Sequence, residues 1–148
     1  MFPSLDELKT RYPNAHVWAF GDSSEMADEL AQLVIAGEKK ASCSSLAAWP
    51  QGDEKVTVGD YHIVLDGREK PVCVIQTTSL KLIRFNEVSA QDAAAEGEGD
   101  KSLRYWRNEH RAFFERSGYF SEEMELVFET FTRVFPEADT VANCVSQK

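Results

Sequence analysis

The chain has little positive charge, few cysteines and no long apolar run. Its 148 residues include 16 Lys or Arg against 25 Asp or Glu, which gives a formal net charge of -9. Because affinity for phosphate comes from Lys and Arg, this balance argues against sequence-blind coating of nucleic acid. The sequence has no apolar stretch of about 18 residues, which argues against a transmembrane helix. We therefore expect no membrane partner.

The three cysteines have no spacing typical of a metal site or a redox motif. Cys43, Cys73 and Cys144 form no CxxC pair. The N-terminus lacks the basic and then apolar segments of a secretory signal. Free thiols are typical of a reduced compartment, so we predict a cytoplasmic protein with unpaired cysteines.

Hydrophobic periodicity and length predict one α+β domain over residues 1–148, with 137–148 as a loose C-terminal tail. The expected helices are a short one before Pro13, 25–36, 89–95 and one capped by Asp100 that runs to about Arg116. The expected strands are 16–20, one that begins near Lys39, 61–65, 71–80 with an extension to 85, and 126–135. This order favours a small β-barrel of mixed strands flanked by helices.

A lysine and several polar side chains follow the second expected helix, in the segment 37–44. A partly buried lysine loses proton affinity and can act as a base, and a nearby hydroxyl can be its partner. In a regular strand Lys39 and Ser42 would point to opposite faces, so they converge only if a turn follows Gly37. The simpler alternative is an exposed pair, Lys39 and Lys40, at the start of a strand.

Two further side chains adjoin this segment. Cys43 lies inside it, and Trp49 follows shortly after it. An aromatic ring beside a site can stack on a nucleobase. Trp49 can equally fill the core, and both interpretations stay open.

Three carboxylates alternate with glycines at Glu96, Glu98 and Asp100. Carboxylate oxygens are ligands that Mg²⁺ prefers, which makes Glu98 and Asp100 candidate metal ligands. One carboxylate could instead transfer protons as a general acid or base. The structural alternative is that these charges stabilise the start of the following helix.

The helix expected over 101–116 combines an apolar stripe with an arginine edge. The arginines on that edge are Arg104, Arg107 and Arg111. Arginine beside an apolar face suits the rim of a cleft that receives phosphate or carboxylate. His110 lies in the stripe and is expected to be a core histidine. The opposite face, with Tyr105 and Glu109, is expected to be ordinary surface.

Taken together, these segments resemble the activating-signal-cointegrator homology (ASCH) domain, in its longer bacterial stand-alone form. The segments that carry the resemblance are the signature G-x-K-x-A/T-S/T at 37–42, V-G-D-Y at 58–61, V-L-D-G at 64–67, F-N-E-V at 85–88 and E-G-E-G-D-K-S-L-R-Y-W-R at 96–107. The resemblance covers about residues 15–135. It implies a barrel similar to the pseudouridine-synthase-and-archaeosine-transglycosylase (PUA) fold, with a cleft between barrel and helices.

The resemblance implies two different activities. A compact branch looks like an amidohydrolase that removes acetyl from N4-acetylcytidine with a Lys, a Thr and a Glu, which correspond to Lys39, Ser42 and Glu96. A longer branch is linked to Mg²⁺-dependent cleavage of single-stranded RNA, with Lys39 and Ser102 in the cleft. In overall pattern the chain lies nearer the longer branch.

We therefore expect first a ribonuclease-like hydrolase of single-stranded RNA, with Mg²⁺ as a possible cofactor. Its binding residues would be Lys40, Cys43, Trp49, Arg104, Arg107 and Arg111. The alternatives are an amidohydrolase of a modified nucleoside and a non-catalytic module that binds RNA or another ligand. The sequence leaves the oligomeric state open.

Overall fold

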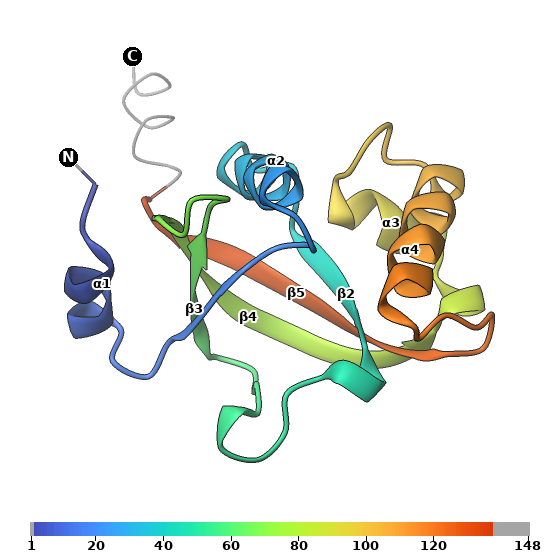
Figure 1. The fold of residues 1–148 in the computed structure, drawn as a ribbon, viewed down its shortest axis with the longest axis horizontal. Coiled ribbons are helices and arrows are strands. Elements are labelled where there is room, and N and C mark those ends of the chain that lie inside the picture. Colours follow the sequence, from blue (N-terminus) through green and yellow to red (C-terminus); the bar gives the residue numbers. More distant parts are fainter. Residues whose placement is uncertain (1, 138–148) are drawn as a thin grey trace.

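Two long antiparallel strands organise the molecule, which is described here by a computed structural model covering residues 2–137. The expected tail over 137–148 lies outside the described residues, except for Glu137. The strands are β1 (His16–Ala19), β2 (Ala41–Ser45), β3 (Tyr61–Leu65), β4 (Pro71–Arg84) and β5 (Glu125–Phe135). They form one mixed sheet in the order β1-β3-β4-β5-β2 (Figure 1).

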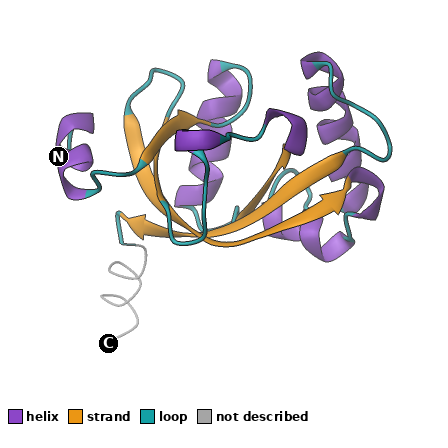
Figure 2. Cartoon of the chain, turned by 90° about the horizontal axis from the view of Figure 1, so that it is seen from below, coloured by secondary structure: helices purple, strands orange, loops and turns teal. Residues whose placement is uncertain are grey.

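The sheet is curled into half a barrel. β1 pairs with β3 in parallel, and the other neighbouring strands pair antiparallel. The register of β4 against β5 shifts twice, between Val74 and Ile75 and between Thr77 and Ser79. Such bulges bend a strand and increase its twist, and both long strands curve strongly in side view (Figure 2). The predicted α+β barrel of mixed strands is confirmed in this open form, with β1 and β2 at its edges.

Four α-helices flank the sheet, close to the positions expected from the sequence. They are α1 (Leu5–Arg11), α2 (Ser24–Ile35), α3 (Ala90–Glu96) and α4 (Leu103–Ser117), with short 3-10 turns at Leu46–Ala48, Gly52–Glu54 and Phe85–Glu87. Their N-caps are Ser4, Ser23, Ser89 and Ser102. Among residues 2–137 no helix has both the length and the apolar character needed to cross a bilayer.

The expected cap of the last helix is wrong. Ser102, two residues after Asp100, caps α4, because its hydroxyl accepts a hydrogen bond from the backbone N–H of Tyr105. Gly99 and Lys101 both have positive φ angles, so the chain turns again before the helix begins. Asp100 instead accepts from the backbone N–H of Ser102, 2.9 Å away.

The core of the described residues forms three clusters, the smallest of which packs Leu8 of α1 on Ile63 and Val74. In the first, Ala93 of α3 and Trp106 of α4 pack with Phe85 and Leu126. Residues of α2 pack with β1, β3 and β4 in a second cluster. The helices therefore stand on the sheet at separate places, α2 apart from α3 and α4 (Figure 1).

Candidate functional site

A cavity of about 840 Å³ lies over the sheet and is lined by residues of α2, α4 and four of the strands. Sites for small molecules commonly have volumes of about 300–1,000 Å³. Its walls include Trp18 of β1, Glu29 of α2 and His110 of α4, and Trp49 lies at its edge in the segment after β2. The cavity therefore has the size and the enclosure of a ligand site.

The side chain of Lys39 is buried in the wall of this cavity. Gly37 follows α2 with a φ of +83°, and this left-handed turn directs the next residues into the molecule. Only 2% of Lys39 is exposed. Its Nζ donates to the carbonyl oxygen of Ala41 at 2.9 Å, to Glu96 Oε1 at 3.1 Å and to Glu98 Oε2 at 2.6 Å. These acceptors, with a longer contact of 3.4 Å to the carbonyl oxygen of Glu96, leave no N–H of the ammonium without a partner.

A glycine allows the two glutamates to approach Lys39. Gly97 has a φ of +70°, and a Cβ there would lie 2.0 Å from the carbonyl oxygen of Glu38. Any larger residue would push the chain that carries Glu96 and Glu98 away from the lysine. The backbone N–H of Lys40 also donates to the carbonyl of Ala95 at 2.8 Å, which joins β2 to α3.

Both carboxylate oxygens of Glu96 have partners. Only 1% of it is exposed, and its Oε2 accepts from the indole N–H of Trp106 at 2.8 Å. Its Oε1 faces Lys39 and lies 3.4 Å from Nε2 of His110. Burial alone would raise the pKa of Glu96, but the charges of Lys39 and His110 hold that pKa well below its usual range. Glu96 is therefore an ionised residue that positions its neighbours.

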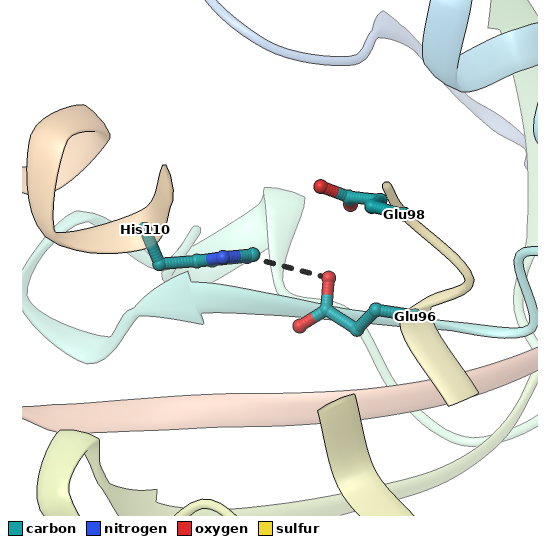
Figure 3. Close-up of side chains that lie close together, drawn as sticks. All are labelled: Glu96, Glu98 and His110. Atoms are coloured by element: carbon teal, nitrogen blue, oxygen red, sulfur yellow. Dashed lines mark ion pairs between the residues drawn. The ribbon is translucent and has the colours of Figure 1, made fainter. Parts of the chain in front are cut away.

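His110 is the site residue that the sequence analysis assigned to the core. Its Nδ1–H donates to the carbonyl of Trp106 at 3.0 Å, and its ring stacks on that indole. Nε2 is thereby directed at Glu96 (Figure 3). Burial alone would lower the pKa of His110, but the carboxylates of Glu96 and Glu98 raise it. The position of His110 in its own helix does not indicate this partner, because Glu96 belongs to α3.

The charge of Lys39 is set by its two carboxylate neighbours. Burial alone would lower its pKa, but Glu96 and Glu98 outweigh burial and raise the pKa of Lys39 above its ordinary value. Lys39 is therefore an ammonium at neutral pH. We refer to Lys39, Glu96, Glu98 and His110 as the Lys39 cluster.

The Lys39 cluster does not fit Mg²⁺. Possible ligand atoms of Glu96, Glu98 and His110 all lie within 4.8 Å of one another. Mg²⁺ favours an octahedral set of oxygen ligands at about 2.0–2.1 Å, however, and this set includes an imidazole. The ammonium of Lys39 also lies between the two carboxylates. Asp100, the other expected ligand, is exposed and does not line the cavity.

The structure brings together only part of the predicted site. The predicted residues that line the cavity are Lys39, Ser42, Cys43, Trp49, Glu96 and Glu98. Those outside its lining are Lys40, Asp100, Ser102, Arg104, Arg107 and Arg111. Arg104, Arg107 and Arg111 are exposed on the flank of α4. Tyr105 and Glu109, expected on ordinary surface, line the cavity together with His110, Phe113 and Phe114 of the apolar stripe.

The arginine edge also has partners of its own on the surface. Arg111 pairs with Glu122 and lies over the ring of Phe120. Cys43, by contrast, is buried beside Glu96, and burial together with that carboxylate raises the pKa of its thiol well above the usual value. Cys43 is therefore a protonated thiol in the wall and a poor nucleophile.

A second polar cluster, which the sequence analysis missed, lies on the sheet under the cavity. The indole N–H of Trp18 donates to Nδ1 of His62 at 2.9 Å. Nε2 of His62 lies 2.8 Å from the hydroxyl of Thr77, which donates to Oε2 of Glu129 at 2.5 Å. We call these four residues the His62 relay. They come from four strands, so no sequence spacing relates them.

The cavity is strongly acidic. Seven carboxylate side chains line it, from Glu29, Asp53, Glu54, Glu96, Glu98, Glu109 and Glu129. Lys39 is the one Lys or Arg among the described lining residues, and two of those carboxylates already bind its ammonium. The cavity therefore favours neutral or cationic ligands over polyanions.

Comparison with known proteins gives a consistent assignment. Residues 16–135 match the ASCH domain. The fold is similar to that of an ASCH domain from Lactobacillus crispatus JV V101, with 38% sequence identity, a TM-score of 0.75 and coverage of 86% of this chain and 84% of that one. It is also similar to a protein from Enterococcus faecalis V583, with 37% identity, a TM-score of 0.73 and coverage of 87% and 88%.

A more distant similarity extends to a variant ASCH protein from Zymomonas mobilis. It has 11% identity, a TM-score of 0.50 and coverage of 89% of this chain and 79% of that one, which is a likeness of fold alone. Comparison with curated proteins gives no match. On the family match and the two similar structures, the chain belongs to the ASCH domain family.

Proposed function

We propose that this protein hydrolyses the amide of an acylated nucleoside amine, as in N4-acetylcytidine. The observation that carries the proposal is the charge of the cavity, whose described lining holds seven carboxylates and a single lysine. A neutral nucleoside can enter such a cavity without electrostatic penalty, whereas a chain of phosphates would meet repulsion. The resemblance of Lys39, Ser42 and Glu96 to the amidohydrolase branch supports the same activity.

Glu98 is the side chain best suited to act as the general base. Its side chain keeps 16% exposure at the cavity, whereas the side chain of Glu96 is 1% exposed and both of its oxygens have partners. In the proposed reaction, water adds to the amide carbonyl carbon and Glu98 accepts a proton from that water. The C–N bond then breaks, and the proton passes to the leaving amine.

Lys39 would stabilise the oxyanion formed in this step. In the resting state its N–H groups are used by Ala41, Glu96 and Glu98. When Glu98 becomes protonated, its hold on Lys39 weakens and one N–H becomes available to the new negative oxygen. Ser42 lies on β2 and lines the cavity. Its hydroxyl would hydrogen-bond the attacking water.

Cleavage of single-stranded RNA, the first expectation from the sequence, has weaker support. The arginines expected to hold phosphates are exposed outside the cavity lining. A non-catalytic module would bind nucleosides without turnover. These alternatives are separated by the same assay.

The assay follows release of cytidine from N4-acetylcytidine by chromatography, with labelled single-stranded RNA incubated in parallel. We expect turnover by the wild type and a loss of about 10²–10⁴-fold in Glu98→Gln, the usual contribution of a general base. Glu123→Gln, which changes an exposed glutamate outside the cavity, is the matched control and should keep full activity. The proposal is wrong if RNA is cleaved in a Lys39-dependent manner while N4-acetylcytidine is not hydrolysed.

A further inference from the structure

We infer that Glu129 is a specificity-determining residue that accepts a hydrogen bond from a sugar hydroxyl of the ligand. The inference rests on the proposed function for its choice of a nucleoside. It concerns the part of the cavity over β3 and β5, to which neither the resemblance nor the proposed chemistry assigns a role. Glu129 would therefore recognise the sugar while the Lys39 cluster acts on the acylated base.

The direction of every hydrogen bond in the His62 relay can be assigned. An indole N–H can only donate, so Nδ1 of His62 is an acceptor. The proton of the neutral imidazole then lies on Nε2 and is donated to the hydroxyl of Thr77. The hydroxyl of Thr77 must in turn donate to Oε2 of Glu129. The relay thus ends on a carboxylate oriented as an acceptor.

Glu129 is buried but lacks a full set of partners. It is 5% exposed and belongs to the lining of the cavity. Its Oε2 accepts from the hydroxyl of Thr77. Its Oε1 accepts no hydrogen bond from residues 2–137, and it is not among their fully enclosed unpaired polar atoms, so it is open to the cavity. A carboxylate oxygen in that position is free to accept a hydrogen bond from a ligand.

Glu129 lies beside Ser42 on the sheet and makes no hydrogen bond with the Lys39 cluster. Glu129 pairs in register with Ser42 across β5 and β2, so the two side chains share the face that lines the cavity. The charges that act on its pKa are those of His16 and Asp60, not those of the Lys39 cluster. A ligand whose amide lies at Lys39 would therefore present a different group to Glu129.

An aromatic wall beside Glu129 fits a nucleoside. The ring of His16 stacks on His62 at 4.8 Å, and the indole of Trp18 meets His62 and Phe20 edge to face. A carboxylate that binds ribose hydroxyls is also the device used by dinucleotide-binding folds. N4-acetylcytidine carries no donor other than its amide N–H and its sugar hydroxyls. The sugar hydroxyls are therefore the donors that remain for Glu129.

The test compares ligands with and without the sugar, using cytidine and cytosine as probes in calorimetric titrations. We expect the wild type to bind cytidine at least about 10-fold more tightly than cytosine, because a hydrogen bond to a charged group contributes that much. Glu129→Gln should lower affinity for cytidine about 10-fold and leave cytosine unchanged. The control is Glu123→Gln, which changes an exposed glutamate outside the cavity lining and should preserve the preference.

The outcomes distinguish this inference from the proposed function. A Glu129→Gln variant that weakens both probes equally would contradict sugar recognition, because a merely structural change would have that effect. Equal binding of both probes by the wild type would also overturn it. If N4-acetylcytidine is not hydrolysed but the cytidine preference depends on Glu129, the hydrolase proposal fails and the sugar site stands. With turnover, Glu129→Gln should raise KM for N4-acetylcytidine but not for N4-acetylcytosine.

Discussion

The cavity joins two polar regions that are buried to a similar degree but held together in different ways. In the Lys39 cluster a cation and carboxylates are in direct contact, with Lys39 at 2.6 Å from Glu98. In the His62 relay the groups joined to the carboxylate are a hydroxyl and a neutral imidazole. One region is an ion-pair network, and the other is a chain of hydrogen bonds.

The difference appears most clearly in the pKa values of two buried glutamates. Burial raises the pKa of each, but only Glu96 has cationic neighbours that reverse the direction and lower it. Glu129 has the neutral hydroxyl of Thr77 as its partner, and burial keeps its pKa raised. The charge of the partner, rather than burial, therefore decides the direction of the pKa shift. This suits the first region for proton transfer and the second for binding.

The largest effect is expected when the cation is removed from the Lys39 cluster. Lys39→Met would leave Glu96 and Glu98 buried beside a neutral chain, and breaking such a network by removing one partner costs about 3–5 kcal/mol. Urea denaturation should measure this loss of unfolding free energy. The double variant Lys39→Met/Glu96→Gln should recover part of it. A loss below about 1 kcal/mol for the single variant would mean that the cluster behaves like a surface ion pair.

The next largest effect is a pH dependence that belongs to the His62 relay. Burial lowers the pKa of His62 from 6.5 to about 4, so the unfolded chain takes up this proton first as the pH falls. The stability that the neutral ring contributes is complete above pH 6.5 and is lost toward pH 4. Between pH 7 and pH 5 this amounts to about 2 kcal/mol.

The His62→Gln variant isolates that contribution. Glutamine can accept from Trp18 and donate to Thr77 but does not titrate. Between pH 7 and pH 5 the wild type should therefore lose about 2 kcal/mol more unfolding free energy than the variant. Identical pH slopes for the two proteins would contradict a neutral, proton-excluding relay.

A smaller effect is expected at the end of the relay. Glu129→Gln keeps an acceptor for Thr77 and leaves no charge without a partner, so its cost should be about 1 kcal/mol or less. Chemical denaturation of Glu129→Gln and Glu96→Gln side by side measures the contrast directly. Glu96→Gln should cost clearly more, and the reverse order would break the distinction between the two regions.

The smallest effect is expected on the exposed flank of α4. Arg104 and Arg107 lie outside the cavity lining, so the double change to glutamine should alter stability by no more than about 0.5 kcal/mol. Turnover of N4-acetylcytidine should be unchanged. A large loss of activity would indicate that substrate binds along the arginine edge after all.

Local patterns allowed most of the fold to be predicted. Periodicity and caps indicated the helices and strands, including the helix that begins after Ser23. The start of α4 was missed because two residues with positive φ, Gly99 and Lys101, delay the helix beyond Asp100. At this turn Gly99 lies close against the ring of Tyr105, and such a close approach is not visible in helix periodicity.

The site was predictable only where its residues lie close in sequence. Lys39 and Ser42 share one segment, and Glu96 and Glu98 share another, so each pair could be recognised as a candidate site from the sequence. The orientation of α4 depends on tertiary packing, which is why His110 was assigned to the core and Arg107 to the site. The His62 relay is assembled from four strands by their register, and no single segment contains a signal for it.

The preference for a neutral ligand is tested most directly by the ratio of kcat/KM for N4-acetylcytidine and its 5′-monophosphate. The two substrates share the amide and the sugar and differ in the phosphate alone. With seven carboxylates around one paired lysine, the nucleoside should be preferred by about 10-fold or more at low salt, with the ratio shrinking as salt rises. A higher kcat/KM for the monophosphate would contradict the account.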